Sequence, residues 1–197
     1  MSKEVGSFRK AWNFVWNDES LLGWLISLIL IFLVIKFIFF PLLSLTLGTY
    51  LPLVVVESES MSHDAFVFGE FDSWWEDNHG WYETFGISRD EARVWSLKSG
   101  LQKGDIAVIL GYRGNDKPKV GDVIVFEAGQ RHPIIHRVIS IEMIDGELFF
   151  DTKGDGNSQQ ISLDKKIPED AVIGRAIVKV PKVGYIKLFF VEIMNAF

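Results

Sequence analysis

One long apolar segment dominates the first quarter of the chain. It runs over residues 21–47, and only four polar side chains interrupt it, which are Ser27, Lys36, Ser44 and Thr46. About 20 apolar helical residues cross the hydrocarbon core of a bilayer, so the pattern predicts a transmembrane anchor at 21–47. Pro41 predicts a kink or an end of this helix. A buried core helix remains an alternative interpretation of the same segment.

The residues after the apolar segment argue against a cleaved signal peptide. Such a peptide has a shorter apolar core followed by small residues at the cleavage site, whereas here the chain continues with Tyr50-Leu51-Pro52 and three valines. The anchor is therefore predicted to remain in the protein.

Basic residues lie almost entirely on one side of the anchor. Lys3, Arg9 and Lys10 precede it, and the next basic residue after it is Arg89. Basic residues favour the cytoplasmic side. This predicts a single-pass protein of the cell membrane, with a cytoplasmic N-terminus at 1–20 and an extracytoplasmic domain at 50–197.

From residue 101 onward, short runs rich in Val and Ile alternate with turn signals such as Asp145-Gly146. This pattern is typical of antiparallel strands. A first strand at 53–57 follows the anchor directly. The later strands are predicted at 105–110, 122–127, 134–143, 147–153 and 172–180.

Residues 65–100 differ from the rest of the chain. They contain four of the seven Trp residues, and 7 acidic against 3 basic residues. Ser88 and Glu91 form a capping-box pattern, and helices are predicted at about 70–85 and 89–96. The segment is either a small subdomain with its own core or an aromatic foot on the membrane surface.

The apolar stretch 186–194 is too short to span a bilayer, and it predicts a surface-lying segment, a last strand or a helix.

Composition excludes several classes of protein. The chain of 197 residues has 48% hydrophobic residues, which is too many for a disordered protein. It has no cysteine, which excludes disulfide scaffolds, thiolate zinc sites and a cysteine nucleophile. The net charge of −6 argues against nucleic acid as a partner.

Three segments carry candidate chemistry. Ser60 follows an apolar strand, so it could be held rigidly as a nucleophile or simply end the strand in a turn. His136 lies inside a predicted strand, where a histidine is either a core residue or a general base. Asp155 belongs to a Gly-Asp-Gly-Asn turn and is either a turn residue or the carboxylate that orients His136.

A metal site and a cofactor are not predicted. His132 and His136 are four residues apart in a predicted strand, so their Cα atoms are about 13 Å apart. That separation is too wide for one zinc ion.

The order of the motifs is more specific than any single motif. An anchor is followed by Ser58-Glu59-Ser60-Met61, then by Gly121–Phe126, His136-Arg137-Val138, Lys153-Gly154-Asp155 and Val172–Ala176. This order resembles type I signal peptidases, and the likeness covers about residues 21–187 with 65–100 as an insertion. His136 stands where bacterial members have Lys, which is similar to the archaeal and endoplasmic-reticulum branch.

The resemblance implies a mainly β fold: an antiparallel signal-peptidase-type β catalytic domain, an N-terminal transmembrane helix and a small Trp-rich helical insertion. It implies a serine endopeptidase that removes signal peptides from secretory preproteins at the outer face of the lipid bilayer. Ser60 would be the nucleophile and His136 the general base. The Ser60 amide and the Ser58 hydroxyl would form the oxyanion hole, and Met61 would line the substrate pocket. The sequence does not indicate accessory subunits.

Two departures from the family pattern stand out. His63 occupies the position where the family usually has Pro, and it is a rival candidate for the base. A second Asp is expected six residues after Asp155, but Ile161 is found there. The supporting acid is therefore either Asp155, which we prefer from the sequence, or Asp164.

These departures leave a second function open, a catalytically inactive membrane-anchored β domain that binds or scaffolds other proteins. A self-cleaving repressor-type protease has a similar fold, but the membrane anchor and the lack of a DNA-binding segment argue against it.

Overall fold

A computed structural model describes residues 20–63 and 70–195 of the chain. The predicted cytoplasmic tip, including Lys3, Arg9 and Lys10, lies outside the described residues, as does the start of the insertion at 65–69. The chain divides into two compact units, residues 1–46 and 47–197, and each is described by itself.

The described part of the first unit is one continuous apolar helix, which ends at the boundary with the second unit. It consists of α2 (Leu21–Val34), a π-helical turn η1 (Ile35–Phe39) and α3 (Phe40–Leu47). Ser20 caps its start, because the Ser20 side chain accepts a hydrogen bond from the Gly23 amide at 3.0 Å. Residues 21–47 form a helix of 27 residues that is long and apolar enough to cross a membrane. This helix therefore fits the predicted membrane anchor.

Pro41 does not end the helix. It lacks the amide hydrogen that an α-helix needs, and its ring crowds the carbonyl four residues earlier. The π-turn lies directly before it, and there the Phe40 amide bonds to the Ile35 carbonyl, five residues back. Local widening of this kind accommodates a proline within a helix.

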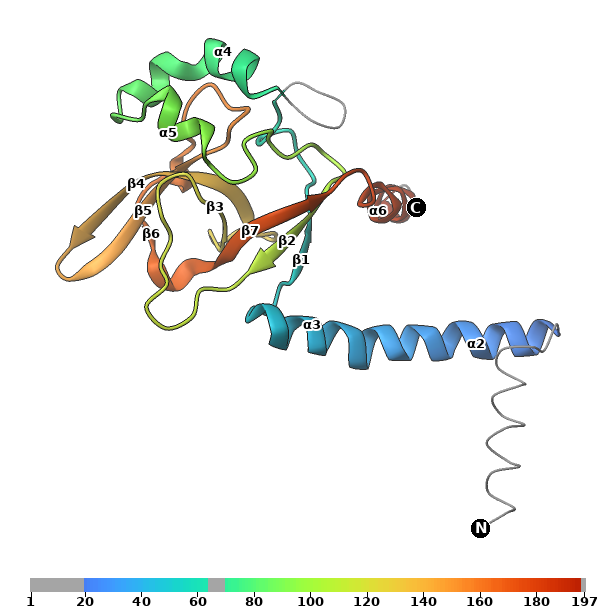
Figure 1. The fold of residues 1–197 in the computed structure, drawn as a ribbon. Helices are drawn as coiled ribbons and strands as arrows, with labels where there is room; N and C mark the ends of the chain where they lie inside the picture. Colours follow the sequence, from blue (N-terminus) through green and yellow to red (C-terminus); the bar gives the residue numbers. More distant parts are fainter. Residues whose placement is uncertain (1–19, 64–69, 196–197) are drawn as a thin grey trace. The chain divides into compact units, whose positions relative to one another are not determined.

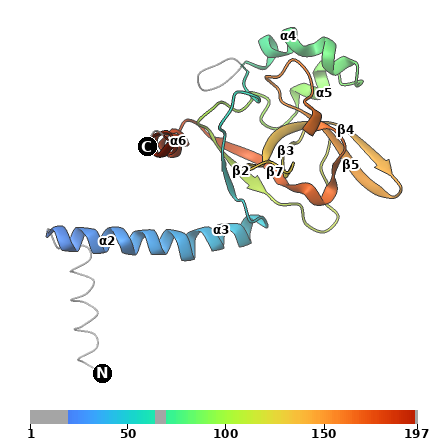
Figure 2. The same ribbon diagram turned by 180° about the vertical axis from the view of Figure 1, so that it is seen from behind.

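The second unit is built on a curled antiparallel sheet of seven strands, in the spatial order β1-β2-β7-β3-β4-β5-β6 (Figures 1 and 2). The order leaves β1 and β6 at the two edges, and it confirms the predicted mainly β class. The short strand β6 was not predicted, because two residues are too few to show an alternating pattern. The strands are β1 (Leu53–Val55), β2 (Ile106–Leu110), β3 (Val123–Phe126), β4 (Ile134–Ile144), β5 (Glu147–Lys153), β6 (Ile167–Pro168) and β7 (Val172–Val180).

Apolar side chains cover both faces of the central strands. On β3, Val123 and Val125 belong to one buried cluster, while Ile124 and Phe126 belong to another. Successive side chains of a strand point to opposite faces, so a sheet buried on both faces shows a continuous apolar run. The predicted strand at 122–127 has this run because β3 is central.

The Trp-rich segment forms helices α4 (Phe71–Glu83) and α5 (Arg89–Arg93). As predicted, the Ser88 side chain caps α5 by accepting from the Glu91 amide at 3.3 Å. The two helices lie over the end of the sheet near β4 (Figures 1 and 2). Together with Ile139 of β4 they form a mainly aromatic buried cluster, which consists of Phe71, Trp74, Trp75, Tyr82, Ile87, Ala92, Trp95 and Ile139.

The last element is the helix α6 (Tyr185–Asn195). This decides between the alternatives left open for residues 186–194 in favour of a helix. Several of its apolar side chains are exposed, including Ile186, Phe189 and Phe190.

A close contact between Trp95, which follows α5, and the turn before β3 makes Gly121 sensitive to substitution. Gly121 has a φ of 92°, and a Cβ there would lie 2.2 Å from the Trp95 ring. We expect Gly121→Ala to lower the free energy of unfolding by about 3 kcal/mol or more, from backbone strain and overpacking. Gly129→Ala is the matched control, because Gly129 also has a positive φ, of 68°, but no atom within 4 Å of a new Cβ. It should cost only about 1–2 kcal/mol, and equal losses in urea unfolding would contradict the steric argument.

Candidate active site

The segment that carries Ser60 leaves β1 and enters a tight turn. The Ser62 amide donates to the Glu59 carbonyl at 2.9 Å, which closes the turn around Ser60. The Ser58 and Ser60 hydroxyls lie 3.1 Å apart. Ser58 is exposed and Ser60 is half-buried, so both hydroxyls are accessible from solvent.

His136 is held by Asp164. Its Nδ1 lies 2.5 Å from Asp164 Oδ1, and both side chains are almost completely buried. The Asp164 carboxylate also accepts the Thr152 hydroxyl at 2.7 Å and the Ile161 amide at 2.9 Å. A carboxylate beside Nδ1 favours the tautomer with the proton on Nδ1. The lone pair of Nε2 is therefore available to accept a proton.

Gly154 lies where His136 and the Ser60 segment approach each other. A Cβ on Gly154 would be 2.9 Å from His136 Nε2 and 2.5 Å from the Ser60 carbonyl oxygen. Any side chain at 154 would therefore separate the two segments. Among the described contacts, the Ser60 hydroxyl bonds to Ser58 and not to His136.

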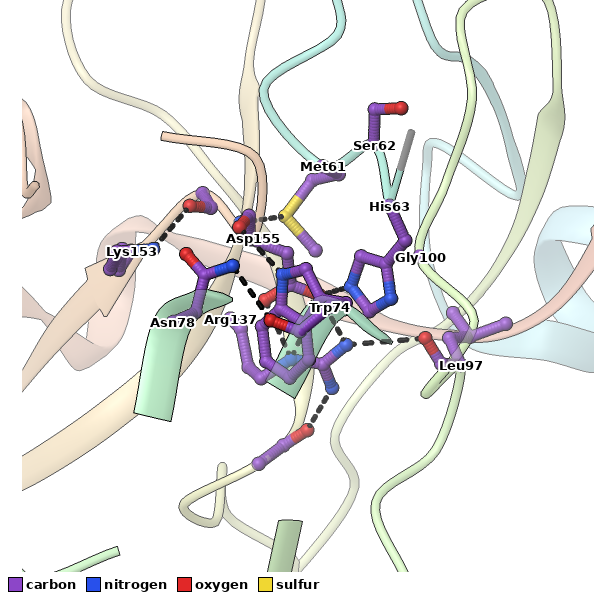
Figure 3. A network of polar contacts seen from close by, with 12 residues as sticks. Met61, Ser62, His63, Trp74, Asn78, Leu97, Gly100, Arg137, Lys153 and Asp155 are labelled. Carbon is purple, nitrogen blue, oxygen red and sulfur yellow. Dashed lines mark hydrogen bonds and ion pairs between the residues drawn. The ribbon is translucent and has the colours of Figure 1, made fainter. Parts of the chain in front are cut away.

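Asp155 lies in a separate buried network (Figure 3). Its carboxylate accepts from Arg137 at 2.6 and 2.9 Å, from His63 Nε2 at 3.1 Å and from the Tyr82 hydroxyl at 3.3 Å. Burial by itself raises the pKa of Asp155, but the charge of Arg137 and the hydrogen bonds from His63 and Arg137 outweigh it and hold this pKa well below its usual range. Asp155 is thus a buried carboxylate that stays ionised.

The sequence-based preference for Asp155 over Asp164 as the partner of His136 is therefore reversed. Neighbouring residues of a strand point to opposite faces. His136 and Arg137 are neighbours on β4, and each has its own aspartate, Asp164 and Asp155. The spacing of the aspartates in the sequence did not reveal this, because the loop between them must fold before their positions are known. The alternation along β4 was the one available signal.

His63 and Met61 are also placed differently from the sequence-based expectations. The His63 ring is stacked on Trp74, with ring centroids 4.3 Å apart and planes 2° apart, and its Nε2 faces Asp155. It does not face Ser60. Met61 is fully buried in the core, where its sulfur accepts the Asp155 amide at 3.4 Å. A side chain in that position contacts the loop and not a solvent-open pocket.

Lys153 is a buried cation that the sequence reasoning did not single out. It lies opposite Arg137 in the pairing of β4 with β5. Its Nζ lies 5.1 and 5.0 Å from the ring centroids of Trp81 and Tyr82 and donates to the Gly154 carbonyl at 3.1 Å. Burial lowers the pKa of Lys153 to about 8, although the charges of Asp155 and Asp164 oppose this shift.

The lowered pKa of Lys153 predicts a pH-dependent stability. The ordinary pKa of a lysine is 10.5 and that of Lys153 in the folded protein is about 8, so between these pH values the unfolded chain binds more protons than the folded one. The free energy of unfolding should then rise with pH in this interval. Lys153→Met removes the titrating group and should flatten this part of the profile. Urea unfolding at several pH values between 7.5 and 10 checks the difference between the two proteins, and parallel profiles would contradict the assignment.

Comparison with known proteins adds a second line of argument. The signal peptidase complex catalytic subunit SEC11 of Lachancea thermotolerans is 32% identical over 106 residues, which cover 49% of this chain and 62% of that protein. SEC11 of Clavispora lusitaniae is 32% identical over 109 residues, covering 50% and 63%. The human subunit SEC11C is 33% identical over 104 residues, covering 47% and 52%. The chain thus spans less than two thirds of the length of these relatives.

No protein-family model matches the chain. The relatives confirm the resemblance that was inferred from the order of the motifs. Over about half of its length, this chain is homologous to the catalytic subunits of signal peptidase complexes.

Proposed function

We propose that the chain is a membrane-anchored serine endopeptidase, a signal peptidase I hydrolase that removes signal peptides from secretory preproteins. The observation that carries the proposal is the buried His136–Asp164 pair, whose free Nε2 faces the Ser60 segment across Gly154. Ser60 is the nucleophile, His136 the general base and Asp164 the acid that orients it. This assignment provides the carboxylate that the six-residue spacing in the sequence did not.

The mechanism follows from the positions of these groups. The Ser60 hydroxyl, which bonds to Ser58 at 3.1 Å, turns toward His136 Nε2. His136 then accepts the proton while Oγ attacks the scissile carbonyl carbon, and Asp164 stabilises the charged imidazole. The Ser60 amide and the Ser58 hydroxyl donate to the developing oxyanion.

Collapse of this intermediate breaks the C–N bond. His136 returns the proton to the leaving amine, which frees the mature protein. Water, deprotonated by His136, then hydrolyses the acyl-enzyme, and the Ser60 hydroxyl is restored.

The sheet offers a place for an extended substrate. Strand β1 pairs only with β2, so its other edge is free among the described strands, and it leads directly to Ser58 and Ser60. A peptide that adds a strand to this edge would present its backbone carbonyls to the nucleophile. Small pockets along the strand would then select small side chains.

The covalent link to the anchor limits how far Ser60 can lie from the membrane. Ser60 lies 13 residues after Leu47, the last helical residue, so the connecting chain extends at most about 45 Å. A signal peptide has its apolar segment in the membrane and its cleavage site just outside. The basic residues before the anchor support a cytoplasmic N-terminus and an extracytoplasmic catalytic domain.

Removal of the Ser60 hydroxyl tests the proposal directly. The full chain in detergent or native membranes should cleave a preprotein, and Ser60→Ala should lower the rate by about a thousandfold or more because no nucleophile remains. Ser62→Ala is the control, since the Ser62 hydroxyl bonds to Gln102 at 2.6 Å and is not part of the mechanism. Gel analysis of the mature product measures both. If wild type and Ser60→Ala both fail on several preproteins, the non-catalytic binding domain becomes the better interpretation.

Substitution of Asp164 should lower the cleavage rate, whereas substitution of Asp155 should lower the stability of the fold. Asp164→Asn should lower kcat by about 10³- to 10⁴-fold, because the amide no longer holds the required tautomer of His136. Asp155→Asn should instead lower the free energy of unfolding by about 3–5 kcal/mol, because it leaves the charge of Arg137 buried without its partner. Cleavage kinetics and urea unfolding of both variants check the assignment. A larger loss of kcat at Asp155 in still-folded protein would restore Asp155 as the acid.

A further inference from the structure

The helical insertion touches the candidate active site at one loop, residues 154–156. Two side chains of α4 make the contact: the Tyr82 hydroxyl bonds to the Asp155 carboxylate, and Trp74 bonds to the backbone of the loop. The Trp74 indole Nε1–H donates to the Asp155 carbonyl at 2.9 Å, and the ring is only 6% exposed. The Asn78 side chain donates to the Trp74 carbonyl at 2.8 Å, which adds a side-chain bond to the helical turn that presents the ring (Figure 3).

His63 extends this contact to the segment of the nucleophile. Its ring is stacked on Trp74 and also lies close to Gly100, where a Cβ would be 2.6 Å from the ring. In this position Nε2 reaches the Asp155 carboxylate. The resemblance led us to expect a rigid proline at residue 63. A histidine packed against Trp74 and Gly100 and hydrogen-bonded to Asp155 restricts the chain there by tertiary contacts instead.

Loop 154–156 contacts both the segment that carries Ser60 and the side chain of His136. The Gly156 amide donates to the Ser60 carbonyl at 2.9 Å, and the Asp155 amide donates to the sulfur of Met61. Gly154 lies against His136 Nε2. A shift of this loop would therefore change the distance between Ser60 and His136 without altering either residue.

We infer that Trp74 and His63 are positioning residues for the proposed cleavage reaction: the insertion uses them to hold loop 154–156, and the loop sets Ser60 against His136. The inference rests on the proposed function and gives the insertion a specific task within it. Neither side chain reacts with the substrate. Because catalysis depends on sub-ångström placement, a displacement of about 1 Å lowers rates by about a hundredfold.

Two neighbouring tryptophans of α4 allow a matched test. Trp75 is as buried as Trp74, but its ring contacts are with Phe71, Trp74 and Tyr82 of the insertion. Trp74→Ala and Trp75→Ala remove the same side chain from the same cluster, and only the first removes the hydrogen bond to the Asp155 carbonyl and the stacking on His63. Trp74→Phe keeps an aromatic ring against His63 and loses the hydrogen bond to Asp155.

We expect Trp74→Ala to lower kcat for preprotein cleavage by about 10- to 100-fold with KM changed less than about threefold. Trp74→Phe should keep a kcat at least about threefold higher than that of Trp74→Ala, since it lacks one hydrogen bond but keeps a ring against His63. Trp75→Ala should lower the melting temperature as much as Trp74→Ala but leave kcat within about threefold. Equal kcat losses in the two alanine variants, or no rescue by Trp74→Phe, would overturn the inference.

A measurement without substrate separates this inference from the proposed function. Hydrogen–deuterium exchange of the Gly156 amide reports its bond to the Ser60 carbonyl. Exchange should be at least tenfold faster in Trp74→Ala than in wild type and Trp75→Ala. The predicted exchange of the Gly156 amide does not depend on whether the wild type cleaves preproteins. If the wild type is inactive but the exchange pattern is as expected, only the proposed function is refuted. Unchanged exchange in Trp74→Ala would refute the positioning role, even in an active enzyme.

Discussion

The buried ion pair between Arg137 and Asp155 is the interaction on which the rest of the site depends. Removing two charges from water is costly unless all their hydrogen-bonding groups find partners. Arg137 meets this condition through Asp155, the carbonyls of Ser96, Leu97 and Gly121, and the face of the Trp95 ring. The pair thereby joins β4, the loop at 154–156 and the segment after α5. All three parts must be in place, because without one of them Arg137 or Asp155 would be a buried charge that lacks a partner.

The two polar networks of the site are kept apart by the geometry of one strand. His136 and Arg137 are adjacent on β4 and point to opposite faces, so Asp164 serves the first and Asp155 the second. This separation lets Asp155 remain ionised as a structural anion, while the pair of His136 and Asp164 stays available for the proton transfer proposed here. Gly154 lies between the networks, and its missing side chain allows His136 and Ser60 to approach.

The helical insertion supports the site through aromatic contacts. Its tryptophans form a mainly aromatic buried cluster together with Ile139 of β4, which agrees with the simpler of the two interpretations drawn from the sequence, and Trp74 also reaches the loop of Asp155. Its acidic residues lie mainly on the outer surface of α4, where Asp72 pairs with Arg89 and Arg93. The role of the insertion as a clamp on the loop, with His63 in place of the expected proline, is the inference that goes beyond the relatives.

The sequence by itself determined most of the elements and the order of the motifs. The apolar run at 21–47, the alternating strands and the Ser88 cap depend on local periodicity and local hydrogen bonds, which are readable along the chain. Only the tertiary structure decided which aspartate serves His136, that His63 and Met61 are buried partners of the Asp155 loop, and that Trp74 contacts this loop. Such choices depend on which face of β4 each residue occupies and how the loop after β5 turns. These contacts join residues 28 to 94 positions apart and follow from packing, and no local pattern encodes them.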